Sequence, residues 1–213
     1  IYSTLFKFLG VKVPEISLIT SCYKATRFLE EYLNSLAEQS FKDFELVLHM
    51  NEMSSDEKEV INSYSKRLNI VLIEENPVIP LYSAWNKCIQ KSSGNYIGIG
   101  NVDDLRSPDS LKYMFEAFKQ NKNLDFVYGD FTTVHSFPSK NGERVDIFSQ
   151  QDKLKIGMIL GPFFMFKRSI LEKTGLFDEQ FKSGGDFDFA MRLVRSGNGC
   201  CLKENLGFYL DEG

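Results

Sequence analysis

Short apolar runs alternate with amphipathic stretches through the first half of the chain. Four runs rich in β-branched residues predict buried strands: Ile16–Thr20, Phe44–His49, Asn69–Ile73 and Tyr96–Gly100. Between them, apolar residues recur at helical spacing from Thr26 onward, in Glu57–Leu68 and in Leu81–Gln90. Strands that alternate with helices through short loops favour parallel pairing with right-handed crossovers. The first half therefore predicts a doubly wound, mostly parallel α/β sheet flanked by helices.

The second half alternates less regularly, and we expect a small antiparallel addition to the sheet there. The expected elements are helices at Leu111–Gln120, Ser169–Thr174 and Phe187–Val194, and strands at Phe126–Tyr128, Phe163–Phe166 and Cys200–Leu210. Thr132–Asp152 is polar and rich in turn residues. We expect this segment to form a hairpin or a mobile loop over the site.

Pro14 separates a short N-terminal stretch from the remainder of the chain. Leu5, Phe6, Phe8 and Leu9 would allow that stretch to touch a membrane surface, but it carries few cations, which favours a packing helix or a linker. We expect residues 1–14 to be an extension and 15–213 to be the domain, with a first half of the nucleotide-binding type at about 15–105 and a second half at about 106–213. The last residue falls within a pattern, so we expect the domain to be truncated at its C-terminus.

Composition narrows the function classes. A formal net charge of -4 with scattered cations argues against general binding of nucleic acid. The 4 cysteines form no CxxC pair, which is typical of reduced thiols in a cytoplasmic protein. No run approaches the length of a membrane span. We therefore expect a cytoplasmic protein, with the inner face of the membrane as the alternative location.

Two adjacent carboxylates, Asp103 and Asp104, directly follow the glycine-punctuated strand at Tyr96–Gly100. In open α/β folds, ligands bind at the carboxyl ends of the strands. Hard oxygen ligands suit Mg²⁺ or Mn²⁺, which share their coordination with substrate phosphates. The alternative is a pair of turn or cap residues. Their position favours a metal-assisted site for a nucleoside diphosphate.

Asp186 follows Gly184-Gly185 at the start of a predicted helix. It is either an ordinary helix cap or a general base that the helix N-terminus keeps ionised. Asn51 and Glu52, at the tip of the second strand, fit a base- or ribose-binding role and a solvated turn equally well. The chain has no GxxxxGK loop and no GxGxxG fingerprint, which argues against the usual ATP and dinucleotide sites.

Five motifs in the same order together resemble the GT-A glycosyltransferases of family 2, particularly the bacterial enzymes that build surface polysaccharides. They are ISLITSCYK, FKDFELVLHMNEMSSDE, LYSAWNKCIQKSSGNYIGIGNVDD, GPFFMFKRSILEKTGLFDEQF and SGGDFDFAMRLVRSG. The resemblance implies a Rossmann-like GT-A fold and transfer of a sugar from a nucleoside-diphosphate sugar to a glycan or lipid-linked acceptor, with inversion and with Mn²⁺ or Mg²⁺.

The resemblance also assigns roles. Asp103 would bind the metal, with Asp104 beside it, and Asp186 would be the base that deprotonates the acceptor hydroxyl. The resemblance assigns the remaining residues to the nucleotide pocket. Its lining would include Ser21, Tyr23 and Asn51, and nearby would lie Tyr82 and Asn86.

The sequence departs from the family pattern at several of these positions. Asn101 stands at the first position of the usual Asp-any-Asp, Asn51-Glu52 replaces two aspartates, Met53 replaces a glycine and Lys24 an asparagine. These changes lower the charge available to a metal and leave the nucleotide open.

Two alternatives remain at this level. A nucleotidyltransferase would require a glycine-rich, basic loop after the first strand, and Ser21–Arg27 does not provide one. A catalytically degenerate sugar-binding or assembly module of a larger synthase would be consistent with Asn101 and Asn51.

Overall fold

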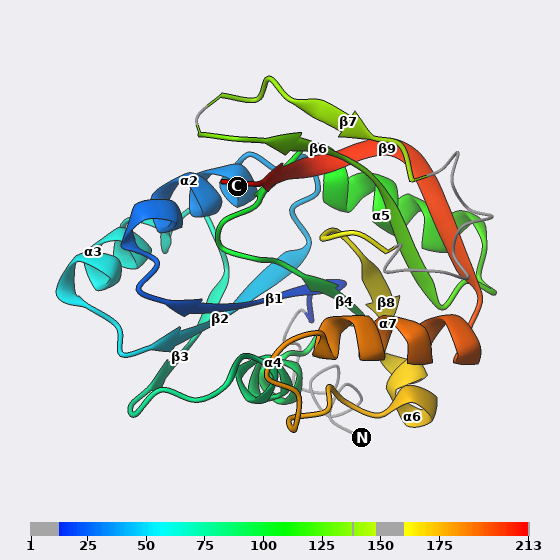
Figure 1. The fold of residues 1–213 in the computed structure, drawn as a ribbon, viewed down its shortest axis with the longest axis horizontal. Helices are drawn as coiled ribbons and strands as arrows, with labels where there is room; N and C mark the ends of the chain where they lie inside the picture. Colours follow the sequence, from blue (N-terminus) through cyan, green and yellow to red (C-terminus); the bar gives the residue numbers. More distant parts are fainter. Residues whose placement is uncertain (1–12, 138, 148–159, 213) are drawn as a thin grey trace.

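The computed structural model describes residues 13–137, 139–147 and 160–212, and within these ranges nine strands form one sheet (Figure 1). The strands run in the order β3-β2-β1-β4-β8-β6-β9-β5, and β7 pairs with β6. Their bounds are β1 (Ile16–Tyr23), β2 (Phe44–Asn51), β3 (Ile70–Glu75), β4 (Tyr96–Ile99), β5 (Leu105–Arg106), β6 (Phe126–Val134), β7 (Glu143–Val145), β8 (Met165–Lys167) and β9 (Gly199–Leu210).

The sheet is parallel in its first half and mixed in its second. β1 pairs in parallel with β2 and β4, so that Ile16 lies between Phe44 and Tyr96, and β2 pairs in parallel with β3. β8 is antiparallel to β4 and β6, whereas β6 and β9 are parallel. The small strands β5 and β7 pair antiparallel with β9 and β6. The predicted fold class, a mostly parallel sheet with an antiparallel addition, is confirmed.

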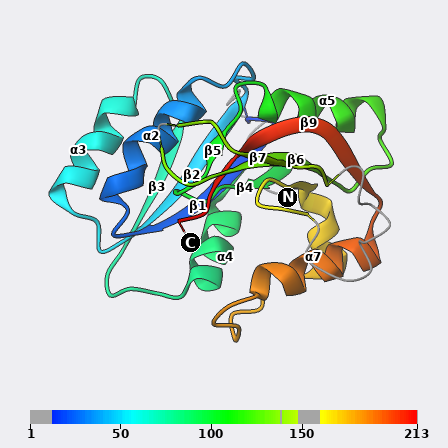
Figure 2. The same cartoon turned by 45° about the horizontal axis from the view of Figure 1, so that its top comes forward.

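Helices cover both faces of this sheet (Figures 1 and 2). One face carries α2 (Thr26–Ala37), α3 (Ser55–Tyr64) and α5 (Ser110–Gln120). The other carries α4 (Leu81–Lys91), the 3-10 helix η2 (Arg168–Ile170), α6 (Leu171–Thr174) and α7 (Gly185–Ser196). No helix in the described ranges is both long and apolar enough to cross a bilayer.

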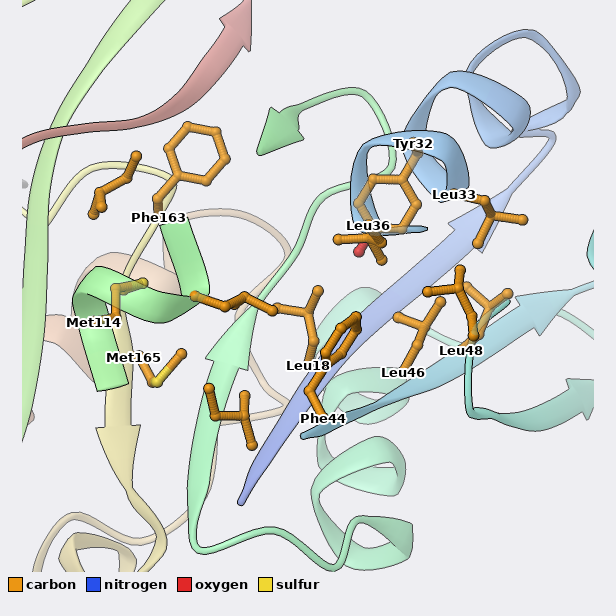
Figure 3. Packing of buried hydrophobic residues seen from close by; sticks show 14 of the residues in the cluster. Leu18, Tyr32, Leu33, Leu36, Phe44, Leu46, Leu48, Met114, Phe163 and Met165 are labelled. Atoms are coloured by element: carbon orange, nitrogen blue, oxygen red, sulfur yellow. The ribbon is translucent and has the colours of Figure 1, made fainter. Parts of the chain in front are cut away.

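Each face of the sheet has its own apolar core. On the α2 face, Leu18, Leu46 and Leu48 from the strands pack against α2, and Met165 and Phe163 extend the cluster toward α5 (Figure 3). This explains why β1 and β2 read as continuous apolar runs, because strands covered on both faces have no solvent side.

Where the structure differs from the expected elements, the observed hydrogen bonds explain the difference. The strand expected at Phe126–Tyr128 is longer in the structure, where β6 continues to Val134 because its second half also pairs with β9. In the polar segment Thr132–Asp152, the end of β6 and β7 form a hairpin, which was one of the two expected structures. Residues 138 and 148–152 of this segment lie outside the described ranges, as do residues 1–12. α3 begins at Ser55 and not at Glu57, because Ser54 forms a capping box with Glu57.

Candidate active site

The carboxyl ends of β1, β2, β3 and β4 meet at one edge of the sheet, since these strands are mutually parallel. Asp103 lies in the turn after β4 at this edge, and its side chain is exposed. α4 connects β3 to β4, so its first residue, Leu81, lies at the same edge. An exposed carboxylate is thus placed where open α/β folds bind their ligands.

Asp104, by contrast, is only 2% exposed. Its Oδ2 accepts a hydrogen bond from Asn101 Nδ2 at 2.9 Å, and its Oδ1 accepts one from the backbone N–H of Leu210 at 3.3 Å. Burial, with a smaller contribution from the charge of Asp103, raises the pKa of the Asp104 carboxyl to about 7. Asp104 therefore fastens the Asn101–Asp104 turn to the end of β9 and leaves Asp103 facing solvent.

The buried carboxyl of Asp104 should make stability depend on pH. An aspartate in an unfolded chain has a pKa of about 3.9. In the folded state the pKa of Asp104 is raised to about 7, so its carboxyl keeps its proton up to that pH. The stability that Asp104 contributes is thus fully present below about pH 4 and is lost as pH rises through about 7. Urea unfolding in metal-free buffer measures the free energy of unfolding of wild type and of Asp104→Asn. The difference, wild type minus variant, should fall as pH rises across this window. A difference that is constant from pH 4 to 7.5 would contradict the assignment.

Asp186 lies in the first turn of α7, after Gly184, whose φ of 74° is left-handed. The hydroxyl of Tyr82, in the first turn of α4, donates to Asp186 Oδ1 at 3.3 Å and accepts from the backbone N–H of Gly185 at 2.8 Å. In Figure 1, α7 begins beside α4. Because α4 starts at the carboxyl edge of the sheet, this contact places Asp186 at the same edge as Asp103.

Asp188, two residues further along α7, has a different role. Its Oδ2 accepts hydrogen bonds from Arg192 Nε at 2.9 Å and Nη2 at 2.7 Å. Arg192 also donates to the backbone carbonyls of Thr174 and Leu176, which tie α7 to the end of α6. Asp188 thus stabilises the helix that carries Asp186.

The two residues predicted at the end of β1 lie at the carboxyl edge of the sheet. Ser21 pairs with His49 of β2 and is partly buried, and Tyr23 pairs with Asn51 and is 47% exposed. Lys24 follows in the left-handed region at φ 52°, with its Nζ 5.0 Å from the centre of the Tyr23 ring. An exposed aromatic ring and a cation therefore flank this end of the sheet.

The amides of Asn51 and Asn86 are both bonded within the protein. Asn51 Oδ1 accepts from the backbone N–H of Ile79 at 3.0 Å, and Nδ2 donates to the Ile79 carbonyl at 3.3 Å. Asn86 makes the same reciprocal pair with the backbone of Phe177, and its Nδ2 also donates to Glu179 Oε1 at 2.8 Å. These two side chains hold the loops before α4 and before α7.

Two residues at the site were not anticipated. Tyr209 of β9 is 39% exposed, and burial, followed by the charges of Asp104, Asp211 and Asp103, raises its pKa. Arg106 of β5 is buried, and its Nη2 donates to the carbonyl of Ile99 at 2.6 Å. The sequence carries no motif for either, since Arg106 is placed by the pairing of β5 with β9 and Tyr209 by the pairing of β9 with β6.

A hollow of about 540 Å³ opens beside the tips of β2 and β3. It is lined by Glu52, Met53, Glu74, Glu75 and Asn76. Glu52 has a left-handed backbone at φ 49° and donates its N–H to the Glu75 carbonyl at 2.9 Å, which fixes the tip of β2 against β3. The hollow is therefore part of the same carboxyl edge.

The donor set at this edge fits a metal that shares its coordination with phosphates. The described ranges hold no group of three His, Cys, Asp or Glu that would enclose an ion. Mg²⁺ sites on phosphate substrates commonly use only one or two carboxylates. Asp103 supplies one exposed carboxylate, and the amide oxygen of Asn101 is a second hard donor two residues away.

Comparison with known proteins is consistent with this architecture. Residues 17–175 match the family model described as glycosyl transferase family 2. The chain is 27% identical over 188 residues to the hyaluronan synthase of Pasteurella multocida. The aligned region covers 87% of this chain and 19% of that protein. The chain thus spans about a fifth of that relative.

Two solved structures show the same fold. TarS 1–349 of S. aureus in complex with UDP-GlcNAc has a TM-score of 0.77 at 17% identity, over 93% of this chain and 59% of that one. The mannosyltransferase PcManGT of Pyrobaculum calidifontis in complex with GDP-Man and Mn²⁺ has a TM-score of 0.69 at 16% identity, over 97% and 63%. These likenesses confirm the GT-A fold. Because the family model covers well over half of its length, the chain belongs to glycosyl transferase family 2.

Proposed function

We propose that this chain is the catalytic domain of a metal-dependent, inverting glycosyltransferase that uses a nucleoside-diphosphate sugar. The observation that carries the proposal is the placement of Asp103 and Asp186, which are far apart in the chain, at one edge of the sheet. The contact between Tyr82 and Asp186 supports this placement. One carboxylate is suited to hold a cation and the other to take a proton.

The donor would lie along the carboxyl edge. Residues 15–105 would hold its nucleotide. Ser21 and Tyr23 at the end of β1 and the loop held by Asn51 would line the nucleotide pocket. The hollow beside β2 and β3 would lie within reach of the base. Mn²⁺ or Mg²⁺ bound at Asp103 would stabilise the charge that develops on the diphosphate leaving group. The printed names of the two structural neighbours, with UDP-GlcNAc, GDP-Man and Mn²⁺, support a donor and a metal of this class.

Asp186 would act on the acceptor. Its carboxylate would take the proton of the attacking hydroxyl while the oxygen bonds to the anomeric carbon and the bond from that carbon to the phosphate oxygen breaks. A single displacement inverts the anomeric centre and requires no covalent sugar–enzyme intermediate. Residues 106–213 would form the acceptor side.

The proposed acceptor class is supported by the relatives and not by the geometry. The name of the Pasteurella relative supports a glycan acceptor in bacterial surface polysaccharide synthesis. A lipid-linked acceptor, at the cytoplasmic face of the membrane with peripheral contact, belongs to the same proposal.

A thermal-shift screen tests the donor class. UDP, GDP, UDP-GlcNAc and GDP-mannose are tested with and without Mn²⁺, since a ligand that binds the native state raises its apparent stability. At least one nucleotide should raise the melting temperature in the presence of Mn²⁺, and less so with EDTA. A flat response to all four nucleotides would contradict a uridine- or guanosine-diphosphate donor.

A catalytically degenerate module is the second candidate function, because Asn101 stands in place of a carboxylate. Such a module would bind nucleotide or sugar but would release no nucleoside diphosphate from any donor. Transfer by wild type that is lost in Asp186→Asn would exclude it.

A further inference from the structure

Tyr82 is held rigidly at the junction of α4 and α7. Its side chain is 4% exposed. The ring packs edge-on against Trp85, with centroids 5.8 Å apart, and stacks on Phe177 at 6.1 Å. A tyrosine in such a packed site has little freedom to swing toward solvent.

The hydroxyl of Tyr82 makes two hydrogen bonds to adjacent residues of α7. It accepts from the backbone N–H of Gly185 at 2.8 Å and donates to Asp186 Oδ1 at 3.3 Å. Gly184, at the cap position, has no side chain to serve the free N–H groups of the first turn. The hydroxyl therefore takes the place of the missing cap and reaches the carboxylate at the same time.

Gly185 leaves the space that this arrangement needs. A Cβ at residue 185 would lie 2.7 to 2.9 Å from three ring carbons of Tyr82. The ring could not yield easily, because Trp85 and Phe177 pack against it. Tyr82 and Gly185 thus form a matched pair across two helices that are about a hundred residues apart in the chain.

We propose that Tyr82 is a positioning residue for Asp186: its hydroxyl fixes one carboxylate oxygen and leaves Oδ2 for the proton of the acceptor. This inference rests on the proposed function, in which Asp186 is the base. Burial, and next the charge of Asp186, raises the pKa of Tyr82, as expected for a phenol that stays protonated and donates to a carboxylate. The role differs from that expected from the sequence, which placed Tyr82 near the nucleotide.

The Tyr82→Phe variant removes the hydroxyl and keeps the ring. We expect kcat for sugar transfer to fall by about 3- to 10-fold, as the loss of one hydrogen bond implies. The donor KM and the dissociation constant of the nucleoside diphosphate should be unchanged. Tyr113→Phe, in α5, is the matched control. A weaker nucleotide affinity with unchanged kcat would show instead that Tyr82 serves the nucleotide pocket, and would overturn the proposal.

A double-mutant cycle tests whether Tyr82 acts through Asp186. If it does, Tyr82→Phe should change the residual rate of Asp186→Asn by less than about two-fold, because coupled groups are not additive. Equal fold-losses in the two backgrounds would overturn the proposal. Gly185→Ala should reproduce the loss of kcat by displacing the ring, again without weakening nucleotide binding.

One measurement does not depend on turnover. With ¹³Cζ-labelled tyrosine, the Tyr82 signal at pH 7.5 should shift in Asp186→Asn while the Tyr113 signal stays in place. If wild type transfers sugar but the Tyr82 signal does not shift in Asp186→Asn, the positioning role alone is overturned. Wild type that transfers no sugar from any nucleotide donor would overturn the proposed function, and the positioning role with it.

Discussion

The Asp186→Asn variant is expected to transfer sugar about 10² to 10⁴ times more slowly than wild type, which is the usual contribution of a positioned general base. In wild type the Tyr82 hydroxyl lies 3.3 Å from Asp186 Oδ1. Asparagine has nearly the same shape as aspartate and keeps an oxygen for this hydroxyl. It cannot take a proton from the acceptor. The loss should appear in kcat, with the donor KM nearly unchanged, in an assay that follows release of the nucleoside diphosphate in the presence of acceptor.

Asp188→Asn is the matched control on the same helix. Its carboxylate binds Arg192 rather than facing the site, so the change should lower the free energy of unfolding by about 1–2 kcal/mol. Transfer should stay within a few-fold of wild type. If Asp186→Asn retains nearly full kcat while Asp188→Asn loses it, the base has been assigned to the wrong aspartate.

The Asp103→Ala variant is expected to lose the Mn²⁺-dependent part of nucleotide binding. Asp103 is the exposed acid of the turn, since Asp104 is buried and accepts hydrogen bonds from Asn101 and Leu210. Removing a direct metal ligand should weaken binding at least as much as the loss of an outer partner, about 100-fold. Titration calorimetry of UDP and GDP, with Mn²⁺ and with EDTA, measures the effect.

Asp109→Ala is the control for this change. Asp109 accepts a hydrogen bond from Ser40 Oγ at 2.5 Å, after the end of α2 and away from the carboxyl edge. Its nucleotide affinity should equal that of wild type. Unchanged Mn²⁺-dependent affinity in Asp103→Ala would show that the metal, if used, is held elsewhere.

The parallel half of the fold could be predicted from sequence because its strands are covered on both sides. Ile16, Leu18 and Ile19 are all fully buried, and such runs are visible without knowledge of their partners. The second half depends on pairing between distant segments. Gly129 occurs inside β6 because β9 approaches closely there, and a Cβ would lie 2.9 Å from the Leu202 carbonyl. Nothing local to residue 129 indicates this.

The sequence indicates which edge of the sheet should carry the candidate residues, but it does not indicate the different contacts that each of them makes. Asp103 and Asp104 are adjacent and chemically identical, yet their burial separates an exposed acid from one whose pKa is raised to about 7. Asn51 and Asn86 belong to motifs of the nucleotide half, but their amides bind the backbones of Ile79 and Phe177. These distinctions arise from tertiary contacts, which no motif records.

The most direct test of the account is paramagnetic broadening of tyrosine signals by Mn²⁺. With ¹³Cζ-labelled tyrosine, adding Mn²⁺ together with UDP or GDP should broaden the Tyr82 signal, because Tyr82 contacts Asp186 at the edge that carries Asp103. Tyr96, at the opposite end of β4, should stay sharper, and the broadening at Tyr82 should vanish in Asp103→Ala. Equal broadening of Tyr82 and Tyr96, or broadening that persists in Asp103→Ala, would contradict a single site shared by the metal and the base.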